Sequence, residues 1–186
     1  MHLILASASP RRAELLSSAG FTYEVAPANV DESVHGDEAP TAYALRVAHD
    51  KARKAVSSMR HHQAGVVLAA DTVVAVGTQI LGKPVDRTDA ARMLRLLSGG
   101  IHEVHTAVVV RRGESEQSEV VTTRVRFLPL NEAEIAWYVA SGEPDGKAGA
   151  YAIQGRGARF IDWIEGSWSA VVGLPIAAVY RLLGRL

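Results

Sequence analysis

Hydrophobic and polar positions in the first part of the chain follow helix and strand periods in turn. His2–Ala6 is a short apolar run, which predicts a buried strand. Pro10–Ala19 should form a helix, because a proline suits the first helical position and Gly20 suits the stop. In Pro40–Val56 the apolar residues return on one face, which predicts a longer helix.

The middle of the chain is richer in strand patterns. Val66–Val76 is β-branched and almost wholly apolar, so it predicts a central strand. A helix is expected over Thr88–Leu97. Glu103–Arg111 and Glu119–Phe127 are long strand candidates, and the polar link containing Gly113 indicates a hairpin between them.

Towards the C-terminus the signals become shorter. Asn131–Ser141 predicts a helix, with Asn131 and Glu134 in capping-box positions and Gly142 at the stop. The remaining predictions are a loop, two short strands and a final helix: Glu143–Gly149, Tyr151–Ile153, Arg159–Ile164 and Pro175–Leu183. The whole pattern predicts an α/β fold with a mixed sheet, and residues 1–186 are expected to form a single domain.

Composition narrows the class of protein. Hydrophobic residues make up 48% of the 186, and 20 basic residues balance 20 acidic ones. A non-specific nucleic-acid binder would need surplus cations, so nucleic acid is not an expected partner. The absence of cysteine excludes thiol nucleophiles and thiolate metal sites. Because no apolar run approaches the roughly 18 residues of a membrane span, we expect a soluble, cytoplasmic protein without a membrane partner.

Two arginines occupy an unusual position. In Ser7–Arg12, a serine and a proline precede Arg11 and Arg12, which fall in the first helical turn. The helix dipole is positive there, so cations are unfavourable unless an anion binds between them. Two solvated surface arginines are the alternative. Because these cations oppose the helix dipole, removing Arg12 should weaken substrate use and leave stability unchanged or slightly raised.

A carboxylate interrupts the most apolar strand. Asp71 and Thr72 lie in the middle of Val66–Val76. Burying an unpaired carboxylate is costly, so the pattern indicates a metal ligand or a general base. An aspartate that caps a loop at the end of the strand is the alternative.

Three further charged residues gain meaning only together. Lys83 precedes a proline that favours an extended backbone, Lys51 lies beside the apolar stripe of its helix, and Glu32 follows an extended stretch. Each could be a surface residue. Together they suit a site where one or two carboxylates and substrate phosphates hold Mg²⁺ while lysines neutralise the remaining charge. His61 and His62 are interpreted as part of a solvated loop.

Several segments in order along the chain resemble the Maf-like nucleotide pyrophosphatases. They are Leu5–Arg12, Ala70–Val74, Gly82–Pro84, Leu96–Gly99, Lys147–Gly155 and Gly166–Pro175. The first and fifth are the most specific. The resemblance runs from Leu3 to about Leu183, which is essentially the whole chain.

The resemblance implies a two-lobed mixed sheet flanked by helices, similar to inosine triphosphate pyrophosphatases, with a central cleft. It implies hydrolysis of a nucleoside triphosphate to the monophosphate and pyrophosphate with Mg²⁺ or Mn²⁺, and it leaves a homodimer open. By position, Asp71 resembles the proton acceptor, and Glu32 and Asp71 the metal-facing carboxylates. The residues similar to triphosphate contacts are Ser7, Arg11, Arg12, Lys51 and Lys83; those similar to selectivity positions are Arg12, Thr72 and Gln154.

Gln154 indicates which branch of the family this chain resembles. Ile153-Gln154-Gly155 is similar to the dTTP/UTP branch, whereas the methylated-GTP branch tends to have Ser-Glu-Gly there. A primary amide offers a donor beside an acceptor, which matches the N3–H and O4 edge of uracil or thymine. The alternatives are a pyrophosphatase for a modified purine nucleotide such as 7-methyl-GTP, or a nucleotide-binding regulator of septum formation.

Overall fold

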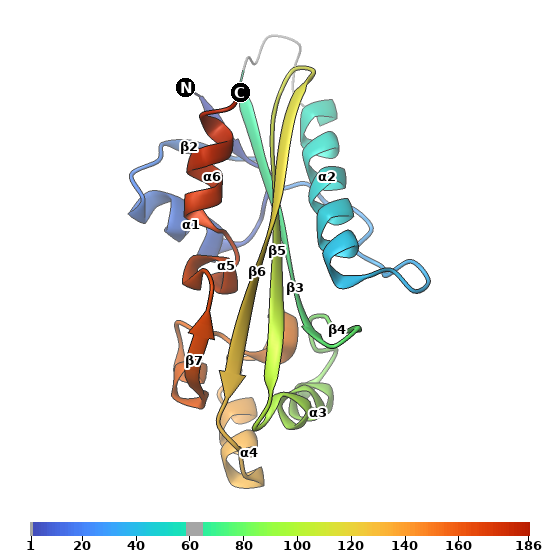
Figure 1. Cartoon of the computed structure of the whole chain (residues 1–186), viewed down its shortest axis with the longest axis vertical. Coiled ribbons are helices and arrows are strands. Elements are labelled where there is room, and N and C mark those ends of the chain that lie inside the picture. The colour runs from blue at the N-terminus through green and yellow to red at the C-terminus, as the bar shows by residue number, and fades with distance from the viewer. Residues whose placement is uncertain (1, 59–64) are drawn as a thin grey trace.

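A single continuous sheet runs through the molecule. The structure, a computed structural model, describes residues 2–58 and 65–186, so the predicted loop at His61 and His62 lies outside the described residues. The sheet has seven strands in the order β2-β1-β3-β5-β6-β7, and β4 pairs with β3 off this path (Figure 1). The strands are β1 (Leu3–Leu5), β2 (Tyr23–Val25), β3 (Val66–Val76), β4 (Gln79–Leu81), β5 (Ile101–Arg112), β6 (Ser115–Phe127) and β7 (Ile161–Glu165).

Helices cover both faces and one end of this sheet (Figure 1). The α-helices are α1 (Pro10–Ser18), α2 (Pro40–Ser58), α3 (Arg87–Leu97), α4 (Glu132–Ala140), α5 (Trp168–Val172) and α6 (Ile176–Leu183), and the 3₁₀ turns are η1 (Ala148–Ala150) and η2 (Arg156–Phe160). β1 pairs in parallel with β2 and β3, whereas β3, β5, β6 and β7 pair antiparallel. The predicted α/β class with a mixed sheet is confirmed.

The alternation of side chains along β3 separates two core layers. Leu68 and Ala70 pack with α1 and α6 on one face, while Val67 and Ala69 pack against α2 on the other. Both faces of β3 are therefore buried, which is why its sequence is almost continuously apolar. Successive residues point to opposite faces, so neighbouring polar residues on this strand must face different helices.

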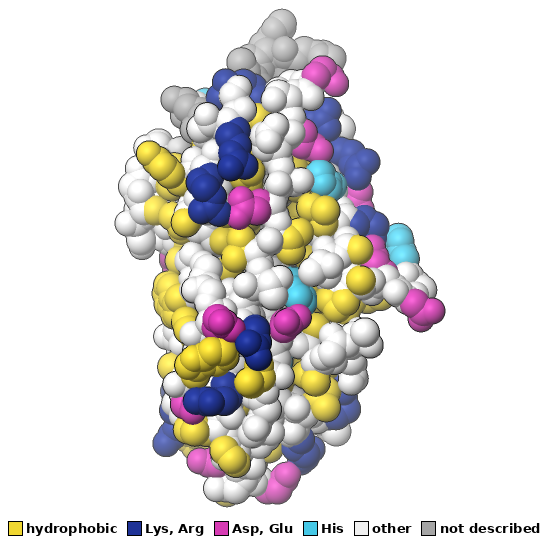
Figure 2. Space-filling view, in the orientation of Figure 1, with side chains coloured by type: hydrophobic (Ala, Val, Ile, Leu, Met, Phe, Trp, Pro, Cys, Tyr) yellow, Lys and Arg dark blue, Asp and Glu magenta, His cyan; other side chains and the backbone are white. Residues whose placement is uncertain are grey.

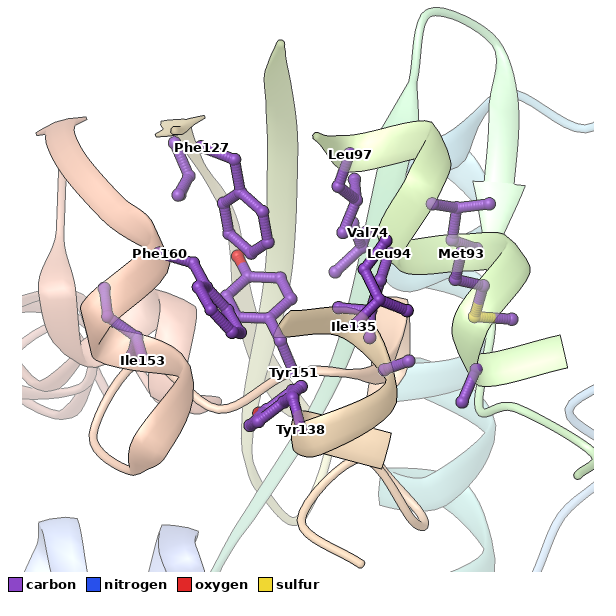
Figure 3. Packing of buried hydrophobic residues seen from close by; sticks show 14 of the residues in the cluster. Val74, Met93, Leu94, Leu97, Phe127, Ile135, Tyr138, Tyr151, Ile153 and Phe160 are labelled. Carbon is purple, nitrogen blue, oxygen red and sulfur yellow. The ribbon is translucent and has the colours of Figure 1, made fainter. Parts of the chain in front are cut away.

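A third core cluster lies at the far end of the sheet. Figure 3 shows Phe127, Tyr138, Tyr151 and Phe160 gathered there, beside leucines of α3. Tyr138 and Phe160 meet edge to face with ring centroids 5.2 Å apart, and both side chains are almost fully buried. This aromatic packing fixes α4 and η2 against the ends of β5 and β6.

Most predicted elements are confirmed, including the hairpin between β5 and β6 and the capping box of Asn131 and Glu134. The predicted strand Tyr151–Ile153 is wrong: this segment is coil and turn, because the Ala152 N–H bonds to the Tyr138 hydroxyl instead of a neighbouring strand. The strand predicted over Arg159–Ile164 begins only at Ile161, since η2 occupies the preceding residues. The elements β2, β4 and α5 were not predicted.

Charges of both signs are interspersed with hydrophobic side chains on the face seen in Figure 2. Arg124 pairs with Glu165 and Arg126 with Asp162, each at 2.9 Å across β6 and β7. Within the described residues, the helices are all too short or too polar to cross a membrane.

Candidate active site

A cleft of about 400 Å³ opens beyond the carboxyl ends of the parallel strands β1 and β2. Ligands of open α/β sheets commonly bind at such strand ends. The nine residues predicted from the sequence all line it: Ser7, Arg11, Arg12, Glu32, Lys51, Asp71, Thr72, Lys83 and Gln154. Their chain segments are far apart in the sequence, so the tertiary fold brings them together.

Asp71 and Thr72 enter this cleft from opposite faces of β3. Asp71 continues the register of Val67 and Ala69 and reaches Lys51 of α2, with Oδ1 and Nζ 2.7 Å apart. Thr72 continues the register of Leu68 and Ala70, and its hydroxyl lies 3.0 Å from that of Thr106. The alternation of the strand thus assigns the carboxylate to one face and the hydroxyl to the other.

Lys51 joins the two predicted metal-facing carboxylates. Its ammonium lies 2.7 Å from Oε1 of Glu32 and 2.7 Å from Oδ1 of Asp71. Lys51 and Asp71 are buried, at 8% and 7% exposed, so their charges interact with little screening. The alternative of a loop-capping aspartate is excluded by this geometry, because Asp71 lies within β3 and its carboxylate accepts from an ammonium and not from a backbone N–H.

Glu32 is held from both sides although its loop has no regular structure. Lys83 donates to its Oε2 at 3.1 Å, and the Tyr43 hydroxyl donates to its backbone carbonyl at 2.8 Å. Partial burial tends to raise the pKa of Glu32, but the hydrogen bonds and charges of Lys51 and Lys83 outweigh it and the net pKa is lowered. Burial, together with the charges of Asp71 and Glu32, raises the pKa of Tyr43 to about 12, so Tyr43 acts as a neutral donor.

The donor set fits a cation that arrives with substrate phosphates. One oxygen of Glu32 and one of Asp71 meet at the same point, where both contact the Lys51 ammonium. In the described parts of the chain no group of three or more His, Asp or Glu side chains could hold a metal ion by itself. Magnesium commonly needs only one or two carboxylates when phosphates and waters complete its shell.

Arg12 is bound to the protein more extensively than its sequence position indicates. Its guanidinium donates to the carbonyls of Gly173 at 2.8 Å and Ala70 at 2.7 Å, and to the hydroxyls of Ser7 at 3.1 Å and Thr72 at 3.3 Å. β1 pairs with β3 only as far as Leu68. The next carbonyl on that edge of β3 belongs to Ala70, and Arg12 donates to it in place of a neighbouring strand. The expectation that removing Arg12 would not lower stability is therefore wrong.

Arg11 behaves differently although it is the adjacent residue. It is half-buried at the cleft, and the described residues offer it neither a carboxylate nor a hydrogen-bond acceptor. Lys147, to which the sequence patterns assigned no role, lies in the same cleft. Burial and then the charge of Arg11 lower the pKa of Lys147, and its ammonium donates only to the carbonyl of Glu143, at 2.6 Å. The charges of Glu143 and Asp145 act in the opposite direction but do not outweigh burial and Arg11, so these two neighbouring cations could accommodate an anion.

Backbone contacts hold Lys83 and Lys147 at neighbouring places. The Gly149 N–H donates to the Gly82 carbonyl at 3.1 Å, which ties the two lysine-bearing segments together. Gly149 has a φ of +68°, and a Cβ there would lie 2.9 Å from the side chain of Val74. Only glycine allows this conformation and this close approach. Lys147 is the first residue of the segment Lys147–Gly155 that resembles the Maf-like family, and that place is the signal that could have identified it.

Gln154 lines the cleft beside Tyr151 and Ala152. Its amide is exposed, and it has no hydrogen-bond partner among the described residues. Nearby Tyr151 is buried, and its hydroxyl lies 2.9 Å from Nε2 of His102. Burial lowers the pKa of His102 to about 4, so this imidazole is neutral near pH 7. This end of the cleft therefore offers aromatic and amide groups in place of charges.

Several known proteins that are similar to this chain in sequence carry the same functional description. A dTTP/UTP pyrophosphatase of Anaeromyxobacter sp. is 55% identical over 98% of this chain and 88% of its own length. Proteins of the same description from Myxococcus xanthus and Koribacter versatilis are 49% and 48% identical, over 98% and 100% of this chain and 91% and 94% of their own lengths.

A more distant likeness is to a solved structure described as a nucleoside-triphosphatase, dITP/XTP pyrophosphatase, from Mycobacterium abscessus. It has a TM-score of 0.45 and 20% identity, over 68% of this chain and 74% of that one. The sequence profile of the family described as Maf-like protein matches residues 2–186. Since this match spans nearly the whole chain, the chain belongs to the Maf-like protein family.

Proposed function

We propose that this protein is a nucleoside triphosphate pyrophosphatase that hydrolyses dTTP and UTP to the monophosphate and pyrophosphate. The observation that carries the proposal is the cleft itself, which is lined by the Lys51-bridged carboxylates, by the cations Arg11 and Lys147 and by Gln154. The relatives described as dTTP/UTP pyrophosphatases support the same reaction, at 46–55% identity over most of the chain.

In the proposed reaction Asp71 is the proton acceptor. It is buried and fixed on a long central strand. One of its oxygens accepts from Lys51, and the other accepts no hydrogen bond from the described residues. The free oxygen would accept a proton from a water that attacks the α-phosphorus. The bond from that phosphorus to the bridging oxygen breaks, and the leaving pyrophosphate takes the electron pair.

The cations of the cleft stabilise the charge that develops on the leaving pyrophosphate. Arg11, Lys83 and Lys147 lie at the cleft surface, where their charges can reach phosphate oxygens. Electrostatic groups that are already in place act strongly, because they need no reorganisation during the reaction. Glu32 and Asp71 are the residues that would hold a divalent cation, Mg²⁺ or Mn²⁺, and that cation would supply further neutralisation of phosphate charge.

Selection of the base is assigned to Gln154. Its unpartnered amide presents a donor next to an acceptor, which complements the O4 and N3–H edge of uracil or thymine. A glutamate would suit the donor-rich edge of guanine better. Gln154 therefore favours a pyrimidine over a modified purine.

The test is a panel of nucleoside triphosphates, including 7-methyl-GTP, with Mg²⁺ or Mn²⁺ and with chelator, and with products identified by chromatography. We expect the highest kcat/KM for dTTP or UTP, monophosphate and pyrophosphate as first products, and loss of activity with chelator. Orthophosphate and diphosphate as first products would refute the reaction type. Preference for 7-methyl-GTP would refute the base assignment, and tight nucleotide binding without turnover would favour a regulator.

A further inference from the structure

The segment that carries Gln154 is held from outside the cleft by one carboxylate. Glu143 follows α4 and lies outside the cleft lining. Its Oε2 accepts from the Arg156 N–H at 2.9 Å, and its Oε1 accepts from the Gly157 N–H at 3.0 Å. Both bonds fix the C-terminal side of the turn that displays Gln154.

The same carboxylate also reaches the N-terminal side of that turn, through a tyrosine. The Tyr138 hydroxyl donates to Oε1 of Glu143 at 2.8 Å and accepts from the Ala152 N–H at 3.0 Å. Tyr138 is completely buried against Phe160, so its hydroxyl cannot move far (Figure 3). Residues 152–157 are thus closed at both ends onto Glu143, and Gln154 lies between the two attachment points.

Two glycines of this turn allow its backbone to pass close to Glu143 and Tyr138. A Cβ at Gly155 would lie 2.5 Å from both carboxylate oxygens of Glu143, and one at Gly157 would lie 2.8 Å from the Tyr138 hydroxyl. The backbone therefore approaches these groups more closely than any other residue would allow. Three donors converge on a group that has only acceptors, which suits an ionised carboxylate and not an amide.

The pKa of Glu143 agrees with this arrangement. Burial alone would raise the pKa, but the hydrogen bonds from Arg156, Gly157 and Tyr138 outweigh it and lower the pKa below its usual value. The backbone carbonyl of Glu143 also accepts a hydrogen bond from the Lys147 ammonium, at 2.6 Å. Its side chain contacts the base end of the cleft, whereas its backbone contacts the phosphate end.

We propose that Glu143 is a positioning residue for base selection: its carboxylate holds the turn of residues 152–157 in the place from which Gln154 reads the nucleobase. The inference rests on the proposed function, because it assumes that Gln154 faces a base. It predicts that losing the carboxylate impairs recognition of the base and leaves recognition of the triphosphate intact.

The test compares Glu143→Gln with Asp145→Asn. The glutamine keeps the size of the side chain but directs an NH₂ group at a backbone N–H, so one donor loses its acceptor. Asp145 lies in the same loop and, like Glu143, contributes negative charge near Lys147. Asp145→Asn therefore removes the same charge without touching the turn. Steady-state kinetics with dTTP, UTP, dATP and dGTP would be combined with inhibition by inorganic tripolyphosphate, which carries the charge but no base.

For Glu143→Gln we expect the ratio of kcat/KM for pyrimidines to that for purines to fall roughly tenfold, the lower end of what an unpaired buried group costs. The inhibition constant of tripolyphosphate should stay within about twofold, as should every value for Asp145→Asn. Equal losses on all four nucleotides and tripolyphosphate, or an unchanged ratio, would overturn the proposal.

If Glu143→Gln does not fold, Tyr138→Phe keeps the buried ring and removes the hydroxyl that links the Ala152 N–H to Glu143, while the bonds of Glu143 to Arg156 and Gly157 remain. The same ratio should then fall by a smaller factor, and an unchanged ratio would overturn the proposal. Failure of the proposed function is recognised separately, because the wild-type protein would not hydrolyse dTTP or UTP. In that case the effect of the substitution on kcat/KM for the nucleotide that wild type prefers would be compared with its effect on the inhibition constant of tripolyphosphate.

Discussion

The two ends of the cleft hold their side chains by different forces. At the phosphate end, Lys51 bridges Glu32 and Asp71 through ionic contacts of 2.7 Å, and neither Arg11 nor Lys147 forms an ion pair with a described residue. At the base end, the turn carrying Gln154 is fixed by hydrogen bonds between Tyr138, Glu143 and the backbone. Charge dominates one end, and directed hydrogen bonds dominate the other.

The difference indicates how each end meets its part of a nucleotide. Long lysine side chains can exchange one anion for another, so the phosphate end can rearrange when a triphosphate arrives. The base end has little freedom, because the Tyr138 hydroxyl and the Glu143 carboxylate are hydrogen-bonded to the backbone of the turn that carries Gln154. Binding strength is therefore expected from the first end and selectivity from the second.

The largest effect is expected at the phosphate end, from Asp71→Asn. The asparagine keeps the size of the side chain but cannot accept the proton from water, and loss of a general base lowers turnover by about 10²–10⁴-fold. The fold should persist, since Lys51 retains Glu32 as a partner. The measurement is kcat on the preferred nucleotide beside a thermal melt, and near-normal turnover in a normally folded variant would remove Asp71 from catalysis.

The second prediction separates two adjacent arginines at this end. Arg12→Ala leaves the carbonyl of Ala70 without its donor and the carbonyl of Gly173 with only the Thr72 hydroxyl, and an unpaired buried acceptor costs about 1–3 kcal/mol of unfolding free energy. Arg11→Ala should keep the wild-type stability and weaken only substrate use. Denaturant unfolding of both variants distinguishes the roles, and equal stabilities would contradict the structural part given to Arg12.

The third prediction concerns the base end. Gln154→Glu sets an acceptor against O4 of the pyrimidine, and such a mismatch costs about 1–3 kcal/mol, which is roughly tenfold to a hundredfold in kcat/KM for dTTP and UTP. Activity on guanine nucleotides should fall less or rise. Proportional losses on both classes would mean that Gln154 acts on the triphosphate or on the fold.

The smallest effect is expected from Lys147→Met. This residue is half-buried, so solvent screens part of its charge, and an ionic contact of this kind is worth about 0.2–1 kcal/mol. KM should rise a few fold for pyrimidine and purine nucleotides alike, while the selectivity ratio stays constant. A change in selectivity without a change in KM would move Lys147 to the base end and break the division between the two ends.

Features that depend on local chemistry were predictable from the sequence. The capping box of α4 uses residues three apart, and the hairpin of β5 and β6 is marked by its own turn, so neither needs the rest of the fold. Asp71 was conspicuous because one carboxylate interrupted an apolar run. The segment Tyr151–Ile153 misled because its buried residues resemble a strand, although its hydrogen bonds go to a side chain.

The sequence by itself determined the alternation of elements and the family resemblance, because both are recorded in short motifs along the chain, and the resemblance in turn implied the nine residues that line the cleft. Only the tertiary structure decided how those residues are partnered. It buried the Arg12 guanidinium against the Ala70 carbonyl and left Arg11 facing the cleft. It also placed Lys51 between two carboxylates and bound the Gln154 turn to Glu143. Such pairings join residues that are distant in the chain, and no local pattern records which of several charged or polar groups will meet once the sheet and helices have packed.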